Sequence, residues 1–266
     1  MARGDTKLIA LDIDGTIIEK TAGVPVHRKV RAAVNEARAA GHKVCLCSAR
    51  PGYYMRDATE GLDEIDAVIG CSGALIEKDG EVIHKDPIAL PILLACFETA
   101  KRLDTYMSFA GDDKIYVCKK GPVLPPLEGG SVFVIIEDEE LLRVLREKDI
   151  YCAFVFTKKG VQKESIFTDE AFKGAAIHKS SMNSFDLVNI ETNKGTGVLF
   201  LAEQYGITSE NVIAIGNDEN DVPMFRAAGT GVAMANASPE VRAAADWIAP
   251  DVRKGGAAEA IRRFAL

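Results

Sequence analysis

The stretch Leu8-Ile9-Ala10-Leu11-Asp12-Ile13-Asp14-Gly15-Thr16 decides the fold class of this chain. Its first four residues are apolar, which is typical of a buried strand, and Gly15 predicts the end of that strand. Asp12 and Asp14 then stand at the carboxyl end of a core strand, where an open α/β sheet has its ligand site. Two carboxylates are costly there unless they bind a cation or transfer protons. The stretch therefore predicts both an α/β fold and a polar site.

Strand and helix patterns alternate around this stretch and again near the end of the chain. Apolar residues at helical spacing predict a helix at 26–40, and Gly41 predicts its end. Alternation of this kind predicts a parallel sheet with right-handed crossovers. The expected strands are 7–12, 44–47, 67–69, 212–215 and 231–234, and the expected later helices are 194–205, 221–228 and 239–245.

The middle of the chain has a different pattern, with short apolar runs separated by turn signals such as Gly111-Asp112-Asp113. It predicts an α+β insert built on an antiparallel sheet at 80–186, and a discontinuous outer domain made of 1–79 and 187–266. Three prolines within 119–130 predict a surface loop. The expected strands of the insert are 81–84, 106–109, 114–118, 131–136, 151–156 and 184–188, and its expected helices are 89–103 and 138–148.

Composition restricts the kind of protein. The chain has 266 residues, a hydrophobic fraction of 47% and a formal net charge of −7. These values suit a globular protein and disfavour a general nucleic-acid binder. No apolar run reaches about 18 residues, so we expect no membrane-spanning helix. The polar first residues lack the apolar segment of a secretory signal, and we expect a cytoplasmic protein.

Six cysteines, at positions 45, 47, 71, 96, 118 and 152, lie mostly in or beside apolar runs. None forms a Cys-x-x-Cys pair, and no histidine stands at zinc-ligand spacing from them. They predict small buried apolar residues in a reducing compartment. Because Cys45 and Cys47 would point to one face of a strand, a metal-binding pair is the alternative.

Three further polar sites follow expected strands or open expected helices. Ser48 follows the second strand, Lys194 opens a later helix, and the oxygen-rich loop 216–221 follows the fourth strand. In a parallel sheet all of them meet Asp12 and Asp14 at one edge. Oxygen ligands suit Mg²⁺, and a lysine with a hydroxyl suits a phosphate. Each site alone could be a solvated loop or a helix cap, but their order and placement together favour phosphoryl transfer.

These motifs resemble those of the haloacid dehalogenase-like (HAD) superfamily, and more narrowly those of its Cof-type branch. That branch carries a type IIB cap inserted after the third core strand. The resemblance covers nearly the whole chain. Four motifs carry it in order along the chain: residues 12–16, Ser48, Lys194-Gly195 and residues 216–221.

The resemblance implies the architecture of the whole chain. The catalytic core would be a Rossmann-like, doubly wound parallel sheet formed by 1–79 and 187–266. The insert at 80–186 would be an α+β cap that closes over the site and determines substrate specificity. The segment 73–76 matches the entry into such a cap, although Ser72 stands where the branch usually has asparagine.

The resemblance also implies a role for each site residue. Asp12 would be the catalytic nucleophile that takes up the phosphoryl group. Asp14 would be the catalytic acid and base, which protonates the leaving oxygen and then deprotonates the attacking water. Ser48 and Lys194 would serve catalysis by binding the phosphoryl oxygens. The implied phosphate contacts are Gly15, Thr16, Ser48, Ala49, Lys194 and Asn220, and the implied Mg²⁺ site comprises Asp12, the Asp14 carbonyl, Asn217 and Asp221, the last supporting bound waters.

Two positions depart from the pattern of the superfamily. Asn217 stands where the pattern has a metal-binding aspartate, so the metal site has one negative charge fewer. Either Asn217 is a neutral ligand or Asp218 takes over part of that role, and we expect the former because Asn217 keeps the spacing from Asp221. Ala49 replaces a glycine, but its backbone amide should still donate to phosphate.

Asp14 distinguishes between reaction types within the superfamily. A dehalogenase expels a halide and needs no acid, so the second aspartate favours phosphoryl transfer. We expect a Mg²⁺-dependent phosphatase that hydrolyses a small phosphorylated metabolite, by resemblance a sugar or sugar-acid phosphate, through an aspartyl-phosphate intermediate. We expect neither nucleic acid nor membrane as a partner, and a monomer or small homo-oligomer. The alternatives are a phosphomutase or phosphotransferase of the same fold, or a catalytically weakened binding or regulatory protein.

Overall fold

A computed structural model of the chain describes residues 6–19, 25–55, 59–62, 65–103, 105–118, 132–157, 162–181 and 184–266. The chain divides into two compact units. The first unit is Met1–His84 with Asn193–Leu266, and the second unit is Lys85–Thr192. The surface loop expected at 119–130 lies outside the described residues.

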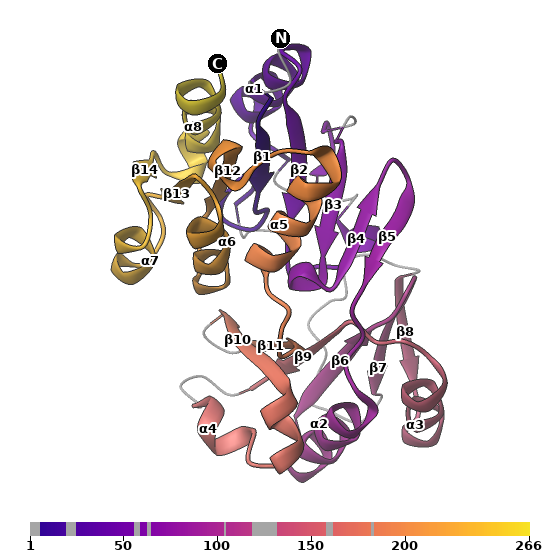
Figure 1. Cartoon of the computed structure of the whole chain (residues 1–266). Coiled ribbons are helices and arrows are strands. Elements are labelled where there is room, and N and C mark those ends of the chain that lie inside the picture. Colours follow the sequence, from indigo (N-terminus) through magenta and orange to yellow (C-terminus); the bar gives the residue numbers. More distant parts are fainter. Residues whose placement is uncertain are drawn as a thin grey trace. The chain divides into compact units, whose positions relative to one another are not determined.

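The first unit is built on an eight-stranded sheet with the order β14-β13-β12-β1-β2-β3-β4-β5 (Figure 1). Neighbouring strands from β14 to β3 are parallel, and β4 runs antiparallel to β3. The strands are β1 (Leu8–Leu11), β2 (Lys43–Cys47), β3 (Ala67–Gly70), β4 (Leu75–Lys78), β5 (Glu81–Lys85), β12 (Val212–Gly216), β13 (Thr230–Met234) and β14 (Trp247–Ala249).

Both faces of this sheet are covered by helices, as Figure 1 shows. Ile9 and Leu11 of β1 lie in a buried cluster with residues of α1 and α8, whereas Leu8 and Ala10 lie in a second cluster with residues of α5, α6 and α7. The prediction of a doubly wound parallel core is therefore confirmed. The helices are α1 (Arg28–Ala39), α5 (Lys194–Tyr205), α6 (Val222–Ala227), α7 (Pro239–Ala243) and α8 (Gly256–Ala265).

Some elements of the first unit differ from the sequence-based expectation. The strand expected at 81–84 is β5, which extends the first sheet next to β4 and does not belong to the insert. The short apolar run Val82-Ile83 between polar residues is compatible with a partly buried strand of either sheet, so the pattern could not assign β5 to a sheet. The expectation also lacked β4, the three-residue strand β14 and the helix α8.

The second unit is built on a six-stranded sheet with the order β10-β11-β9-β6-β7-β8. Helices α2 (Leu90–Leu103) and α3 (Asp138–Glu147) contribute to one buried cluster with residues of this sheet, and a short α4 (Lys163–Ile166) follows β9. The expected antiparallel pairing is wrong for one pair, because β7 and β8 are parallel. The strands are β6 (Tyr106–Ala110), β7 (Ile115–Cys118), β8 (Phe133–Ile136), β9 (Cys152–Phe156), β10 (Ala175–Ser181), which the expectation lacked, and β11 (Ser184–Asn189).

The two units divide after His84 and after Thr192. These positions come later than residues 79 and 186, because β5 belongs to the first sheet and β11 continues the second sheet to Asn189. The assignment of catalysis to the first unit and of specificity to the second remains a prediction.

None of the six cysteines, all of which lie among the described residues, forms a disulfide bond, and all but Cys118 are buried. Burial raises the pKa of Cys45 well above its usual value and, against the effect of Lys194, raises the pKa of Cys47 to about 12. Buried neutral thiols match the apolar role expected for them rather than a metal-binding pair. In the described part of the chain no helix is both long and apolar enough to cross a membrane.

Candidate active site

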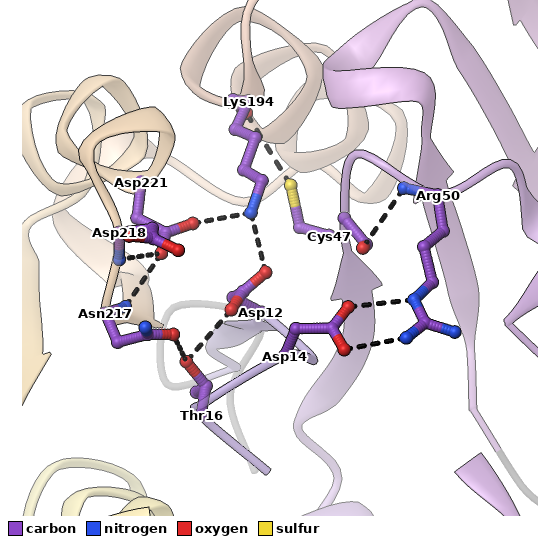
Figure 2. A network of polar contacts seen from close by, with 10 residues as sticks. Asp12, Asp14, Thr16, Cys47, Arg50, Lys194, Asn217, Asp218 and Asp221 are labelled. Carbon is purple, nitrogen blue, oxygen red and sulfur yellow. Dashed lines mark hydrogen bonds and ion pairs between the residues drawn. The ribbon is translucent and has the colours of Figure 1, made fainter. Parts of the chain in front are cut away.

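The expected site residues of the first unit meet at the carboxyl edge of its parallel sheet (Figure 2). Asp12 follows β1 and Asn217 follows β12, and these two strands are neighbours. The chain leaves β1 towards β2 on one side and reaches β12 on the other, so the site lies where the strand order reverses. An open α/β sheet binds its ligands at this position.

Lys194 connects two carboxylates at the centre of the site. Its Nζ donates to Asp12 Oδ1 at 2.7 Å and to Asp221 Oδ1 at 2.5 Å. The Lys194 side chain is 1% exposed and those of Asp12 and Asp221 are 8% and 0% exposed. One buried ammonium therefore neutralises only one of two buried carboxylates.

Burial and the neighbouring charges shift the pKa values of Asp12 and Lys194. Burial, together with the Asp221 carboxylate and against the Lys194 ammonium, raises the pKa of Asp12 to about 7. Burial alone would lower the pKa of Lys194, but the carboxylates of Asp12 and Asp221 raise it well above its usual value. The lysine is thus a fixed cation, and the site retains an excess negative charge that a bound cation would compensate.

Oxygen atoms gather on the other side of Asp12. Thr16 Oγ1 donates to Asp12 Oδ2 at 3.0 Å. The terminal amide atom of Asn217 that faces this side lies 3.2 Å from Asp12 Oδ2, 2.8 Å from the Asp14 carbonyl oxygen and 2.9 Å from Thr16 Oγ1. If this atom is nitrogen, it donates to the three oxygens. If it is oxygen, it accepts from Thr16 Oγ1, but it repels Asp12 Oδ2 and the Asp14 carbonyl oxygen unless a cation lies between them.

These spacings allow a test of the expected metal site. In an octahedral Mg²⁺ site with ligand distances of about 2.1 Å, neighbouring oxygens lie about 3 Å apart. The distances from the Asn217 amide to Asp12 Oδ2 and to the Asp14 carbonyl match this value. Among the described residues no group of three His, Cys, Asp or Glu side chains could hold a metal, so a site here depends on the carbonyl and the amide as well. The residues present fit Mg²⁺.

The loop after β12 explains why Asn217 and not Asp218 faces this cluster. Asp218 caps the short 3₁₀ helix Glu219–Asp221 in a reciprocal capping box with Asp221. Asp221 Oδ2 accepts from the backbone amides of Asn217 at 2.7 Å and Asp218 at 2.9 Å. Since Asp221 also accepts from Lys194, it already binds both the loop and the lysine, and its expected part in metal binding remains a prediction.

Asp14 has its carbonyl and its side chain in different surroundings. Its carbonyl faces the Asn217 amide, whereas its carboxylate accepts two hydrogen bonds from the Arg50 guanidinium (Figure 2). No local sequence pattern marks Arg50 as functional, although it directly follows Ser48-Ala49. Ser48 is buried and its Oγ accepts from the Arg50 amide at 3.2 Å.

Comparison with known proteins identifies the family. The family model of haloacid dehalogenase-like hydrolases matches residues 9–261. The chain belongs to the haloacid dehalogenase-like hydrolases. It is 31% identical to the putative phosphatase YxeH of Bacillus subtilis, with 98% of each chain covered. It is 29% identical to a phosphoglycolate phosphatase of Methanothermobacter thermautotrophicus, with 97% of this chain and 98% of that protein covered.

The expected HAD family and Cof-type branch are confirmed. The expectation that the chain is an enzyme, a phosphoric monoester hydrolase, is confirmed as well. A solved HAD subclass IIB sugar phosphatase, BT4131, has the same fold with a TM-score of 0.85. Its sequence is 23% identical, and the alignment covers 97% of this chain and 99% of that one.

Three expected phosphate contacts of this HAD chain lie within or beside the site. The backbone amides of Gly15 and Thr16 donate inside their own loop, to the carbonyls of Ile18 and Ile13. Asn220 is buried in the 3₁₀ helix before α6. Gly15 has a φ of +90°, and a Cβ there would lie 2.7 Å from the Asn217 amide, so the loop needs glycine at this place. The phosphate-binding roles remain predictions.

Glycine at the start of α5 allows Lys194 to reach both carboxylates. A Cβ on Gly195 would lie 2.5 Å from the Pro223 carbonyl oxygen, which is a backbone atom of α6. We expect Gly195→Ala to push the first turn of α5 away from α6, to destabilise the protein by about 1–3 kcal/mol and to lower kcat at least about tenfold through displacement of Lys194. Urea unfolding and steady-state kinetics measure the two effects.

The matched control lies at the other end of the same helix. Gly206 ends α5 with a φ of +67°, and a Cβ there meets nothing within 4 Å. Gly206→Ala should cost about 1 kcal/mol through backbone strain and leave kcat unchanged. If both variants lost activity in proportion to stability, Gly195 would have no specific effect on Lys194.

Proposed function

We propose that this HAD hydrolase is a Mg²⁺-dependent phosphatase that hydrolyses a small phosphorylated metabolite through an aspartyl-phosphate intermediate. The observation that carries the proposal is the buried Asp12, which has Lys194 on one oxygen and the oxygen cluster of Asp14 and Asn217 on the other. Phosphate monoesters need very large rate enhancements, up to roughly 10²¹. Fixed positive charge and a positioned nucleophile are the main means of achieving them.

In the first step Asp12 attacks phosphorus. Because Oδ2 belongs to the oxygen cluster, we assign the attack to Oδ1, which Lys194 holds at 2.7 Å. The Oδ1–P bond forms while the bond from phosphorus to the ester oxygen breaks. The electron pair goes to the ester oxygen, which takes a proton from Asp14. Lys194 and Ser48 would bind the phosphoryl oxygens.

In the second step water attacks the aspartyl phosphate. Asp14 takes a proton from that water, the new O–P bond forms, and the Oδ1–P bond breaks to release inorganic phosphate and free Asp12. Asp14 thus ends the cycle in its starting protonation state. The chain needs no other proton carrier for this cycle.

Asp12 Oδ2, the Asp14 carbonyl and Asn217 would hold the Mg²⁺ ion, and Asp221 would fix the loop that carries Asn217. When bound, the ion supplies positive charge that stabilises the phosphoryl group during transfer. Asn217 would turn its amide oxygen inwards for this purpose. Without the ion, the amide nitrogen of Asn217 would face inwards, because it can donate to Asp12 Oδ2 and to the Asp14 carbonyl oxygen.

We expect Asn217→Asp to bind Mg²⁺ about tenfold more tightly, because a carboxylate adds one negative charge to the ligand set. In the metal-free protein the same change loses the donor and adds a charge beside Asp12, so the melting temperature should fall without Mg²⁺ and rise more steeply when it is added. Isothermal titration calorimetry and thermal unfolding with and without chelator provide the measurements.

Asp218→Asn is the control for this prediction. It removes a neighbouring charge but keeps a capping side chain, so the affinity for Mg²⁺ should change no more than about threefold. A strong loss of affinity in Asp218→Asn, with no gain in Asn217→Asp, would identify Asp218 as the ligand.

The substrate class remains part of the proposal. The relatives include a phosphoglycolate phosphatase and a solved sugar phosphatase, and they support a sugar or sugar-acid phosphate here. The second unit would supply the residues that recognise the leaving group. Release of inorganic phosphate from a panel of phosphorylated metabolites, with Mg²⁺ present, tests the proposal.

The same panel discriminates between the alternatives. A phosphomutase or phosphotransferase would consume substrate without a matching amount of inorganic phosphate. A binding or regulatory protein would release none from any substrate or from p-nitrophenyl phosphate, and would gain no activity in Asn217→Asp. A phosphatase releases phosphate in step with substrate loss.

A further inference from the structure

Arg50 fixes the direction of the Asp14 carboxylate. Its Nε donates to Oδ2 at 2.8 Å and its Nη2 donates to Oδ1 at 2.7 Å (Figure 2). The guanidinium also lies over the Tyr54 ring, 5.1 Å from its centroid. The side chains of Arg50 and Asp14 are only 27% and 33% exposed. A planar fork with two hydrogen bonds determines the orientation of a carboxylate, which a point charge such as lysine does not.

The orientation of the Asp14 carboxylate matters because Asp14 has two proposed roles. Its carbonyl belongs to the cation site, and its carboxylate transfers protons. Its carbonyl belongs to the oxygen cluster that fits a cation, 2.8 Å from the Asn217 amide. A carboxylate free to turn beside a divalent cation would become a ligand of that cation. It would then be lost as a proton donor. Figure 2 shows the Asp14 carboxylate turned towards Arg50 and away from Asp12.

Arg50 is also tied to the expected phosphate side of the site. Its backbone amide donates to Ser48 Oγ at 3.2 Å, and its carbonyl accepts from the Cys71 amide at 3.1 Å. Arg50 therefore connects two site residues. Its backbone amide binds Ser48, and its guanidinium binds the Asp14 carboxylate. This connection fixes where the acid stands relative to the phosphate ligand.

We propose that Arg50 is a positioning residue that keeps the Asp14 carboxylate out of the cation site and thereby available for proton transfer at the leaving oxygen. This inference rests on the proposed function. Asp14 gives its proton to the ester oxygen as the bond to phosphorus breaks. A poor leaving group such as phenolate needs that proton, whereas p-nitrophenolate is stable enough to leave without it.

The test compares phenyl phosphate with p-nitrophenyl phosphate as substrates of the full chain with Mg²⁺. Arg50→Met should lower kcat/KM for phenyl phosphate about 10²-fold, the range of a lost general acid, and for p-nitrophenyl phosphate no more than about threefold. Arg50→Lys, which keeps the charge but not the fork, should show the same discrimination. Asp14→Asn should show it too, and adding Arg50→Met to it should cause little further loss.

Arg262→Met is the matched control, because Arg262 makes an equivalent two-bond pair with Glu36 in the first unit. It should leave both substrates unchanged. Equal losses for the two substrates in Arg50→Met, or losses that add fully to those of Asp14→Asn, would overturn the role of Arg50 while leaving the phosphatase intact. A wild-type protein that hydrolyses neither ester would overturn the proposed function and, with it, this inference.

Discussion

Asp12→Asn is expected to lower turnover at least about 10⁴-fold, because the amide cannot attack phosphorus and no other described side chain stands in its place. The replacement has nearly the same shape, and its amide oxygen can still accept a hydrogen bond from Lys194. Phosphate release under saturating substrate and Mg²⁺ measures the loss. A well-folded variant with full activity would remove Asp12 from the mechanism.

The same variant should be more stable than the wild type when no metal is present. Folding raises the pKa of Asp12 from 3.8 to about 7, so the folded protein binds this proton more tightly than the unfolded chain does. Wild-type stability therefore falls, relative to Asp12→Asn, as the pH rises from about 4 to about 7, and the difference is constant above that. Urea unfolding in the presence of a chelator at several pH values measures it.

Asp251→Asn is the control, because its effect on folding stability should have the opposite sign. Arg253 lowers the pKa of Asp251 through hydrogen bonds to its carboxylate, so ionised Asp251 stabilises the folded state and its removal should cost stability at neutral pH. If Asp12→Asn destabilised the protein as much as Asp251→Asn does, Lys194 would fully compensate the charge of the buried Asp12 carboxylate.

Lys194→Met is expected to have the largest effect on stability. It leaves Asp12 and Asp221 buried together with no counter-charge, and removal of one partner from a buried ion pair typically costs about 3–5 kcal/mol. Turnover should also fall about 10³-fold, because the fixed cation beside the phosphoryl group is lost. Urea unfolding and phosphate release measure the two effects.

A double variant separates the two consequences of this change. Asp221→Asn in the Lys194→Met background removes one of the two uncompensated carboxylates, so stability should largely recover while turnover does not. Lys43→Met is the matched control, since the Lys43 side chain is 38% exposed and its partner Asp66 keeps a second cation, Arg38. This change should cost no more than about 1 kcal/mol. Equal costs for the two lysines would contradict the buried-charge argument.

Much of the fold and part of the site could be predicted from local patterns. Apolar runs followed by Asp12, Ser48 and Asn217 identify strand ends, and parallel strands bring such ends to one edge. The position of β5 could not be predicted, because its short apolar run fits either sheet. The short strand β14 contains too few residues for periodicity to identify it.

The contacts between distant side chains were not predictable in the same way. Arg50 stands two residues after Ser48, yet its pairing with Asp14 depends on how two loops approach one another. The choice of Asn217 over Asp218 depends on the capping of a short 3₁₀ helix. The need for glycine at 195 depends on the backbone of α6. Such contacts arise from tertiary packing and have no local sequence signal.

The pairing of β1 with β12, in which Leu8 lies opposite Val212, has a consequence for biosynthesis. The central strand of the first sheet leaves the ribosome early but lacks one of its two neighbours until β12 has also emerged. The second unit is one continuous segment, Lys85–Thr192, and can complete its own sheet before that. Ribosome-bound chains in which Thr192 has left the exit tunnel but Val212 has not should therefore protect the second unit from protease while β1 remains accessible.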